Sequence, residues 1–280
     1  MKIALRFLLV LFLFTCTLEL QAQRKPKLKG NREVTTVTES LPPFSRLELL
    51  HDLQIVLKRS AEEAYTITAD DNLVDVIKFK VNDGTLVISS FYDITAKKEL
   101  SIVVSFSQLD AIIVQAGRVE TGEGEKLNTD ALRIETRGDS RVVLDGDVGN
   151  LSVEMRDNSK GEFTMTADSL AVDMRQKSDA QLYVNSFSGS VNIQDNTVLQ
   201  MEGTSGSFDL EIKGDGKLRA QDFEVDDLRA SFSGSADTRI FARNRLQISL
   251  TGTSRCYLFS EPEITLTTFK DSAEFFKRNK

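Results

Sequence analysis

The stretch LRIETRGDSRVVLDGDVGNLSVEMRDNSKGEFTMTADSLAVDM, residues 132–174, contains the pattern that decides the fold. Within it, the segments LRIET, LSVEM and LAVDM begin at Leu132, Leu151 and Leu170, 19 residues apart. Each segment alternates apolar and polar residues, as a β-strand with one buried face does. A fixed interval between similar strands indicates a repeat architecture.

The repeat continues through the second half of the chain. The first inward residue of each unit is placed at Leu132, Leu151, Leu170, Val191, Phe208, Leu228, Leu246 and Ile264. The position two residues later is apolar in every unit: Ile134, Val153, Val172, Ile193, Leu210, Ala230, Ile248 and Leu266. Each strand precedes a polar corner such as RGDS or RDNS, whose Gly, Asn, Asp and Ser residues favour sharp turns. A second short strand follows the corner, as in RVVLD at 141–145.

Two or three short strands per repeat of about 19 residues, with no helical period, predict an all-β fold. We expect a single-chain, right-handed parallel β-helix, a solenoid whose rungs are stable only when stacked on their neighbours. A β-sandwich is the rival interpretation, but antiparallel strands have no reason to keep so even a period. The β-rich segment 41–131 is less regular and carries a hairpin signal at Asp83-Gly84. It is expected to form an N-terminal β cap and the first rungs, and residues 132–280 the regular rungs.

The N-terminus has the features of a secretory signal peptide, residues 1–22. Lys2 and Arg6 precede a short apolar run at 7–15, which is too short for a stable membrane span. An uncleaved anchor and lipidation at Cys16 are the alternatives. Residues 23–40 are expected to be a polar tether or a loosely paired first strand. The protein is thus expected to be exported to the periplasm, the outer-membrane surface or the extracellular space, with no transmembrane span after cleavage.

Charge and cysteine content restrict the partners and the source of stability. The formal net charge of −7 becomes about −8 without residues 1–22, which argues against nucleic acid and anionic membrane surfaces as partners. Cys256 is then the only cysteine, so stability in an oxidising compartment must come from packing without an intramolecular disulfide. Cys256 falls in a column with Val142 and Leu218, which is typical of a buried thiol.

Several segments resemble a known family. They are LPPFSRLELLHDLQIVL at 41–57, LSIVVSFSQLDAIIVQAG at 100–117, and the repeats with Gly-Asp-Ser or Ser-Gly-Ser corners. Together they are similar to the auto-transporter adhesin head domain, or GIN domain, of Bacteroidetes, over about residues 40–270. The resemblance implies a secreted or envelope-exposed β-helix, with 41–280 as one domain. Its motifs are diffuse and provide no catalytic residues to transfer.

Two columns of charge are predicted on one face. Three residues after the unit starts the column reads Glu135, Glu154, Asp173, Gln194 and Glu211, and two residues further it reads Arg137, Arg156, Arg175, Asn196 and Lys213. Stacked rungs would place an acidic ladder beside a basic one. One interpretation is a salt-bridged, aggregation-resistant surface. The other is a contact face for a glycan or a protein partner.

Candidate catalytic and metal-binding residues are few. His51 is the only histidine, which excludes multi-histidine metal sites and His-dependent triads, and it is expected to be a half-buried structural residue. The carboxylate pairs Asp145/Asp147, Asp226/Asp227 and Glu261/Glu263 are expected in corners, whereas glycoside hydrolysis needs two carboxyls that converge across a cleft. The corner containing Asp145 and Asp147 could bind calcium, but the sequence there matches no recognisable calcium-binding pattern.

Aromatic residues favour a core over a sugar cleft. The chain has no Trp and only four Tyr, and its 17 Phe are expected mainly in the core, for example Phe163, Phe208 and Phe232. The sequence therefore predicts a non-catalytic, adhesin-like binding module without cofactor or metal, which presents an extended face to a glycan or an envelope protein. A carbohydrate-active lyase or hydrolase on the same scaffold, and a structural periplasmic accessory protein acting as a homo-oligomer, are the alternatives.

Overall fold

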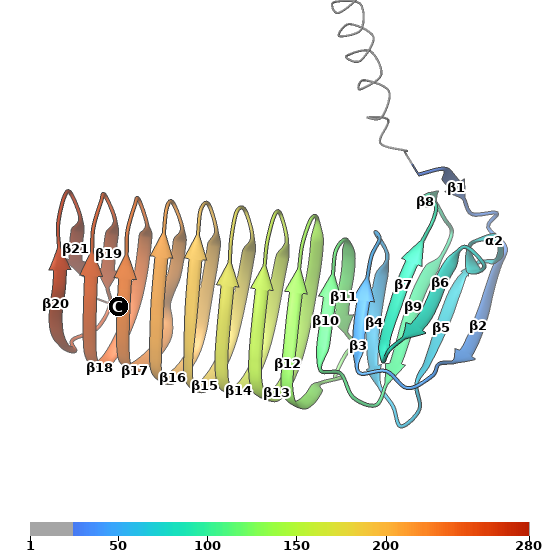
Figure 1. The fold of residues 1–280 in the computed structure, drawn as a ribbon, viewed down its shortest axis with the longest axis horizontal. Coiled ribbons are helices and arrows are strands. Elements are labelled where there is room, and N and C mark those ends of the chain that lie inside the picture. The colour runs from blue at the N-terminus through green and yellow to red at the C-terminus, as the bar shows by residue number, and fades with distance from the viewer. Residues whose placement is uncertain (1–24, 280) are drawn as a thin grey trace, which may run out of the picture.

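The structure, a computed structural model, describes residues 25–279, so the predicted signal peptide and Cys16 lie outside the described residues. It is a parallel β-solenoid of about nine turns, with rungs about 19 residues apart. Figure 1 shows the rungs stacked side by side, with an irregular group of strands at the N-terminal end. The predicted all-β solenoid with a less regular N-terminal part is confirmed.

The regular stack is built from ten strands. They are β12 (Leu127–Thr136), β13 (Ser140–Met155), β14 (Lys160–Met174), β15 (Asp179–Gln194), β16 (Val198–Lys213), β17 (Lys217–Phe232), β18 (Asp237–Leu250), β19 (Arg255–Leu258), β20 (Glu263–Phe269) and β21 (Glu274–Lys277). All neighbouring pairs among them are parallel.

The two corners of each rung differ. The polar corner, such as 137–139, separates consecutive strands, but in β13–β18 the second corner is only a bend inside one long strand. In β13, for example, ladder pairing to β14 continues through this bend from Asp145 to Val148. The predicted separate short strands are therefore joined, because hydrogen bonding to the neighbouring rungs continues around the bend.

The polar corners form a ladder of their own. Each contains a residue with positive φ, in the column Gly138, Asp157, Gln176, Asp195, Gly214, Gly234, Gly252 and Asp271. Side chains from one rung cap the backbone of the rung before it: Gly138 N–H donates to Asp157 Oδ2 at 2.9 Å, and Asp157 N–H donates to Gln176 Oε1 at 2.6 Å. These bonds offset the cost of the left-handed conformation at non-glycine residues.

The register corrects one unit start. Leu170 pairs with Gly189, and Val172 pairs with Val191, so Val191 belongs to the second inward column and Gly189 to the first. Gly189 pairs in turn with Phe208, which makes both intervals 19 residues. A Cβ at Gly189 would lie 2.4 Å from Phe208 Cε2. The first inward column has no apolar side chain at Gly189, because the ring of Phe208 from the next rung fills the space.

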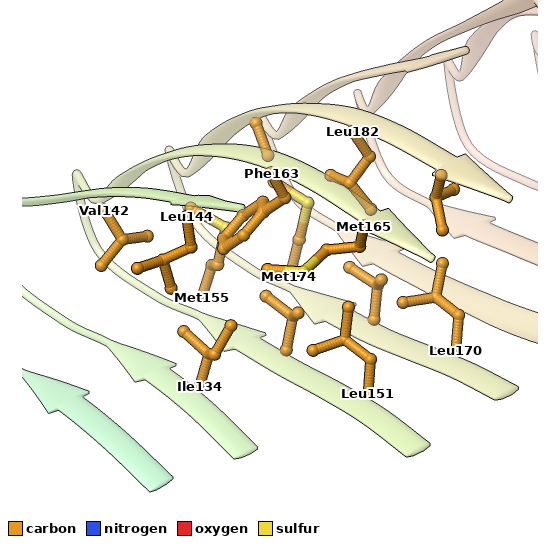
Figure 2. Packing of buried hydrophobic residues seen from close by; sticks show 14 of the residues in the cluster. Ile134, Val142, Leu144, Leu151, Met155, Phe163, Met165, Leu170, Met174 and Leu182 are labelled. Carbon is orange, nitrogen blue, oxygen red and sulfur yellow. The ribbon is translucent and has the colours of Figure 1, made fainter. Parts of the chain in front are cut away.

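The core runs along the inside of the solenoid. Figure 2 shows Phe163 beside Leu144, Met155 and Met174, with Ile134, Leu151 and Leu170 along the opposite strands. The expected core residues Phe163, Phe208 and Phe232 are buried, and Phe223 joins them. Its ring meets that of Phe208 edge to face at 5.0 Å.

The remaining elements precede the regular stack. They are β1 (Lys27–Lys29), β2 (Val34–Ser40), β3 (Arg46–Leu49), β4 (Gln54–Arg59), β5 (Ala64–Asp70), α2 (Asp71–Val74), β6 (Ile77–Asn82), β7 (Thr85–Ser90), β8 (Asp93–Ala96), β9 (Leu100–Phe106), β10 (Ala111–Val114) and β11 (Gly117–Thr121). Segment 23–40 thus contains β1 and β2, and β2 pairs antiparallel with β5 over seven residues.

Parallel stacking also includes strands before Leu132. One face continues as β7–β3–β10–β12 and the other as β9–β4–β11–β13, all parallel. Antiparallel strands then cover this end: β6 pairs with β7, and β5 pairs with β9. The β6–β7 hairpin turns at Asp83 and Gly84, both with positive φ, as the sequence predicts.

Candidate functional site

The charge ladder lies on the sheet face formed by the second halves of β12–β16. Glu135, Glu154 and Asp173 stack in register as expected, but the column continues with Asn192 rather than Gln194 and then reaches Glu211. Gln194 is instead the neighbour of Lys213 in the basic column, so Asn196 is not part of it. This correction follows from the misplaced start at Val191.

Each acid of the ladder pairs with the base two residues after it in the same rung. Arg137 lies 3.4 Å from Glu135, Arg156 lies 3.6 Å from Glu154, Arg175 lies 2.7 Å from Asp173, and Lys213 lies 2.7 Å from Glu211. Arg133 bridges two rungs by contacting both Glu135 and Glu154. The bond to Asp173 also raises the pKa of the Arg175 guanidinium. Because the charges neutralise one another within the ladder, it offers little uncompensated charge to a partner.

A groove runs beside the ladder on the same face. We call it the serine groove. Its floor consists of Ser169, Ala171, Ser188, Ser190 and Ser207. The hollow over these residues has a volume of about 790 Å³. A second hollow of about 530 Å³ shares Ser190, and a third of about 540 Å³ shares Ser169 and Ala171. The shared residues make the groove continuous along the solenoid axis.

The groove exists because two outward columns carry small side chains. Ser169, Ser188 and Ser207 stack in one column, and Ala171 and Ser190 stack in the next. Rungs are about 4.8 Å apart, so the floor repeats its hydroxyl groups at that interval. A serine hydroxyl both donates and accepts hydrogen bonds, so the floor can bind polar ligands without discriminating by charge.

The margins of the groove are polar, and an exposed aromatic residue precedes Ser188 of its floor in the sequence. At its C-terminal end Arg245 holds Asp227 through two bonds of 2.8 and 2.5 Å, and this contact lowers the pKa of Asp227. Phe187, between Ser186 and Ser188 at the bend of β15, is 77% exposed. An aromatic ring this exposed next to a groove is a recognisable contact point for a partner.

The other candidate residues do not assemble a reaction centre. His51 Nδ1 accepts the backbone N–H of Ser90 at 3.1 Å, and burial followed by the charge of Lys25 lowers its pKa. Asp145 and Asp147 both lie near Lys126 Nζ, at 3.6 and 3.5 Å.

Three of the four carboxylates in the two remaining pairs form ion pairs with bases. Asp226 contacts Arg243 and Asp227 contacts Arg245, while Glu261 contacts Lys277. Among residues 25–279, no group of three or more His, Cys, Asp or Glu side chains is placed to hold a metal ion. Over the same range, no helix is long and apolar enough to cross a membrane.

Cys256 lies in the column with Val142 and Leu218, and it is fully buried. Burial raises the pKa of its thiol to about 12. Since the thiolate is the reactive form, we expect less than one tenth of the protein to react with a thiol reagent such as dithionitrobenzoate at pH 8, and complete reaction in guanidinium chloride. Rapid modification of the native protein would contradict this burial.

Sequence reasoning missed the serine groove. The signal was present as Ser or Ala at two outward positions of successive repeats, but the misplaced start at Val191 broke both columns. The Ser and Ala residues of the floor also add nothing to the apolar alternation of the strands. They could be identified as a column only once the register between rungs was known.

Comparisons with known proteins place the chain among adhesin-like domains. The family described as "putative auto-transporter adhesin, head GIN domain" matches residues 43–180 and 158–262. No curated protein matches the chain. Two solved structures of similar fold are a putative adhesin of Parabacteroides merdae (15% identity, TM-score 0.64, 90% of this chain and 99% of that chain covered) and one of Parabacteroides distasonis (14%, 0.67, 89% and 99%). A third, a putative lipid binding protein of Parabacteroides distasonis, is similar at 17% identity with a TM-score of 0.63, covering 90% of this chain and 99% of that chain.

Proposed function

The chain belongs to the GIN-domain family of auto-transporter adhesin heads, and we propose that it is a non-catalytic, exported binding module whose contact surface is the serine groove. The single observation that supports the proposal most is the continuity of this groove across successive rungs. An extended surface of this kind suits an elongated ligand better than a small compact substrate. The family implies an envelope-exposed or secreted protein, which agrees with the predicted signal peptide.

The chemistry of the groove favours a neutral, hydroxyl-rich ligand such as a glycan. The floor offers hydroxyl groups, and the nearby charges of Asp227 and Arg245, and of Glu211 and Lys213, are already paired. A charged ligand would have to compete with these pairs. Phe187 offers an apolar ring face to a sugar or to an apolar side chain of a protein partner. An envelope protein with a polar extended segment is the other partner that fits this surface.

The charge ladder has a different role in this proposal. Its residues Glu135, Arg137, Glu154, Arg156, Asp173, Arg175, Glu211 and Lys213 form ion pairs at the surface, in which Glu135, Glu154 and Asp173 are half-buried. Surface ion pairs contribute little to affinity or stability individually. We assign them to solubility and to resistance against sheet-to-sheet association.

Filling the groove is expected to weaken binding. Ser190 and Ser207 are exposed, so Ser190→Tyr with Ser207→Tyr adds bulk to the floor without entering the core. We expect at least about a tenfold loss of affinity for glycans or envelope proteins bound by the wild-type chain, because the phenol rings occupy the contact volume. A glycan array identifies a ligand of the wild-type chain, and titration calorimetry then measures the affinity of both proteins for it.

Two comparison variants separate the groove from the ladder. Thr164→Tyr places the same side chain at an exposed position on the other sheet and should leave binding unchanged. Replacing Arg137, Arg156 and Arg175 together with Ser should also preserve it. If the ladder variant lost binding and the groove variant kept it, the contact surface would be the ladder and not the groove. Release of a cleaved sugar product would instead support an enzyme.

A further inference from the structure

The last rung of the solenoid has an open edge. Within residues 25–279, β20 pairs with β18 and β21 pairs with β19, and neither has a partner on its other side. In Figure 1, β20 and β21 form the end of the stack opposite the N-terminal strands. An unpaired strand exposes backbone N–H and C=O groups that can pair with another strand.

The inward side chains of β20 lack their usual cover. Leu246, Ile248 and Leu250 of the preceding rung are at most 1% exposed. Their register partners Ile264, Leu266 and Phe269 are 44%, 48% and 49% exposed. The three residues therefore continue the apolar columns of the core to the surface, where burial would remove further apolar area from water.

The core at the opposite end of the solenoid is covered, although the outermost strands β2 and β6 each have only one partner among the described residues. There β5 and β6 extend the two faces with antiparallel strands, and Leu73 of the short helix α2 is fully buried. The apolar residues of the edge strand β6, Ile77, Phe79 and Val81, are buried or half-buried, so this end offers a second copy less exposed apolar surface than β20 does. An association that joins two equivalent β20 ends is therefore favoured.

The two strands of the open end, β20 and β21, differ in whether charged residues protect them from pairing with another strand. In β21 the inward position that follows buried Leu258 is occupied by Lys277, whose ammonium pairs with Glu261. Arg278 lies over the rings of Tyr257 and Phe276, at 5.5 and 5.6 Å. Inward and flanking charges of this kind protect an edge from pairing. In β20, by contrast, no charge lies between Glu263 and Lys270.

We propose that β20 pairs antiparallel with β20 of a second copy of this chain, around a two-fold axis at Thr265. In this register Ile264 faces Leu266 of the second copy, so that apolar residues meet on the inner side of both sheets. In the same register Glu263 faces Thr267 of the second copy, so no like charges meet across the pairing. The register of β20 against β18 shifts only after Leu266, so the three residues around the axis, Ile264 to Leu266, lie in its regular part.

The first test is the mass of the particle in solution. Sedimentation velocity on the chain purified without residues 1–22 should show a concentration-dependent dimer. Leu266→Lys should weaken it by more than about tenfold, because a lysine ammonium would be buried opposite Ile264. Tyr183→Lys is the matched control, since Tyr183 is 49% exposed on a side face of the stack, and it should dimerise like the wild type. Circular dichroism and thermal melting verify that both variants fold.

The second test reports on the axis directly. Thr265→Cys should form an intermolecular disulfide under mild oxidation, since the two residues face each other across the axis within disulfide range. Cys256 is buried and does not compete. Thr166→Cys, an exposed position in the middle of the stack, should not form one. A monomer at all concentrations, a dimer insensitive to Leu266→Lys, or equal cross-linking at both positions would each overturn the proposal.

Discussion

Phe208→Ala should lower the free energy of unfolding by about 3–5 kcal/mol, the range measured when a buried aromatic ring is removed from a core. Phe208 is 2% exposed, and its ring fills the space left by the missing side chain of Gly189 while contacting Phe223. No neighbouring residue can replace this volume, so the variant leaves a cavity between two rungs. Urea unfolding followed by circular dichroism measures the change.

The matched control is Phe187→Ala, which removes the same side chain from a surface position. Because Phe187 is 77% exposed, its loss should change stability by at most about 0.5 kcal/mol. A double-mutant cycle with Gly189→Ala tests the specific contact. Gly189→Ala should cost less in the Phe208→Ala background than alone, because the Cβ no longer meets the ring. Equal costs in both backgrounds would show that the two positions do not share one space.

Gly203→Ala is expected to be the most damaging glycine substitution in the stack, with a loss of about 3 kcal/mol. Gly203 has a φ of +113°, and a Cβ built on it would lie 2.1 Å from the carbonyl oxygen of Val184 in the preceding rung. Both the backbone conformation and the close approach therefore exclude a side chain. The carbonyl belongs to the ladder between β15 and β16 and cannot move without breaking its hydrogen bonds. Thermal and urea unfolding measure the loss.

Gly124→Ala separates backbone strain from the steric clash. Gly124 has a φ of +75°, but a Cβ there meets no atom within 4 Å. Its substitution should therefore cost only about 1 kcal/mol, from the backbone conformation alone. If both variants lost the same stability, the contact with Val184 would not contribute and the expected order would be wrong.

The sequence by itself determined the solenoid, its polar corners and the inward columns in every unit but the one containing Gly189. These features follow from local chemistry, because a buried face needs an apolar residue at every second position and a sharp turn needs Gly, Asp or Asn. The alternating pattern therefore identifies Ile134, Val153 and Val172 as inward residues without knowledge of the other rungs. The burial of Cys256 follows from the same column logic.

Only the tertiary structure decided the features that depend on contacts between rungs. Gly189 occupies an inward position that the pattern could not reveal, because the ring of Phe208 supplies its volume from the next rung. The groove of Ser169, Ser188 and Ser207 depends on that corrected register. The parallel pairing of β3 with β10 spans the strands inserted between them in sequence, and the exposed β20 is visible only once its neighbours are placed. Register and edge exposure arise from packing between distant residues, whereas the repeat arises within each rung.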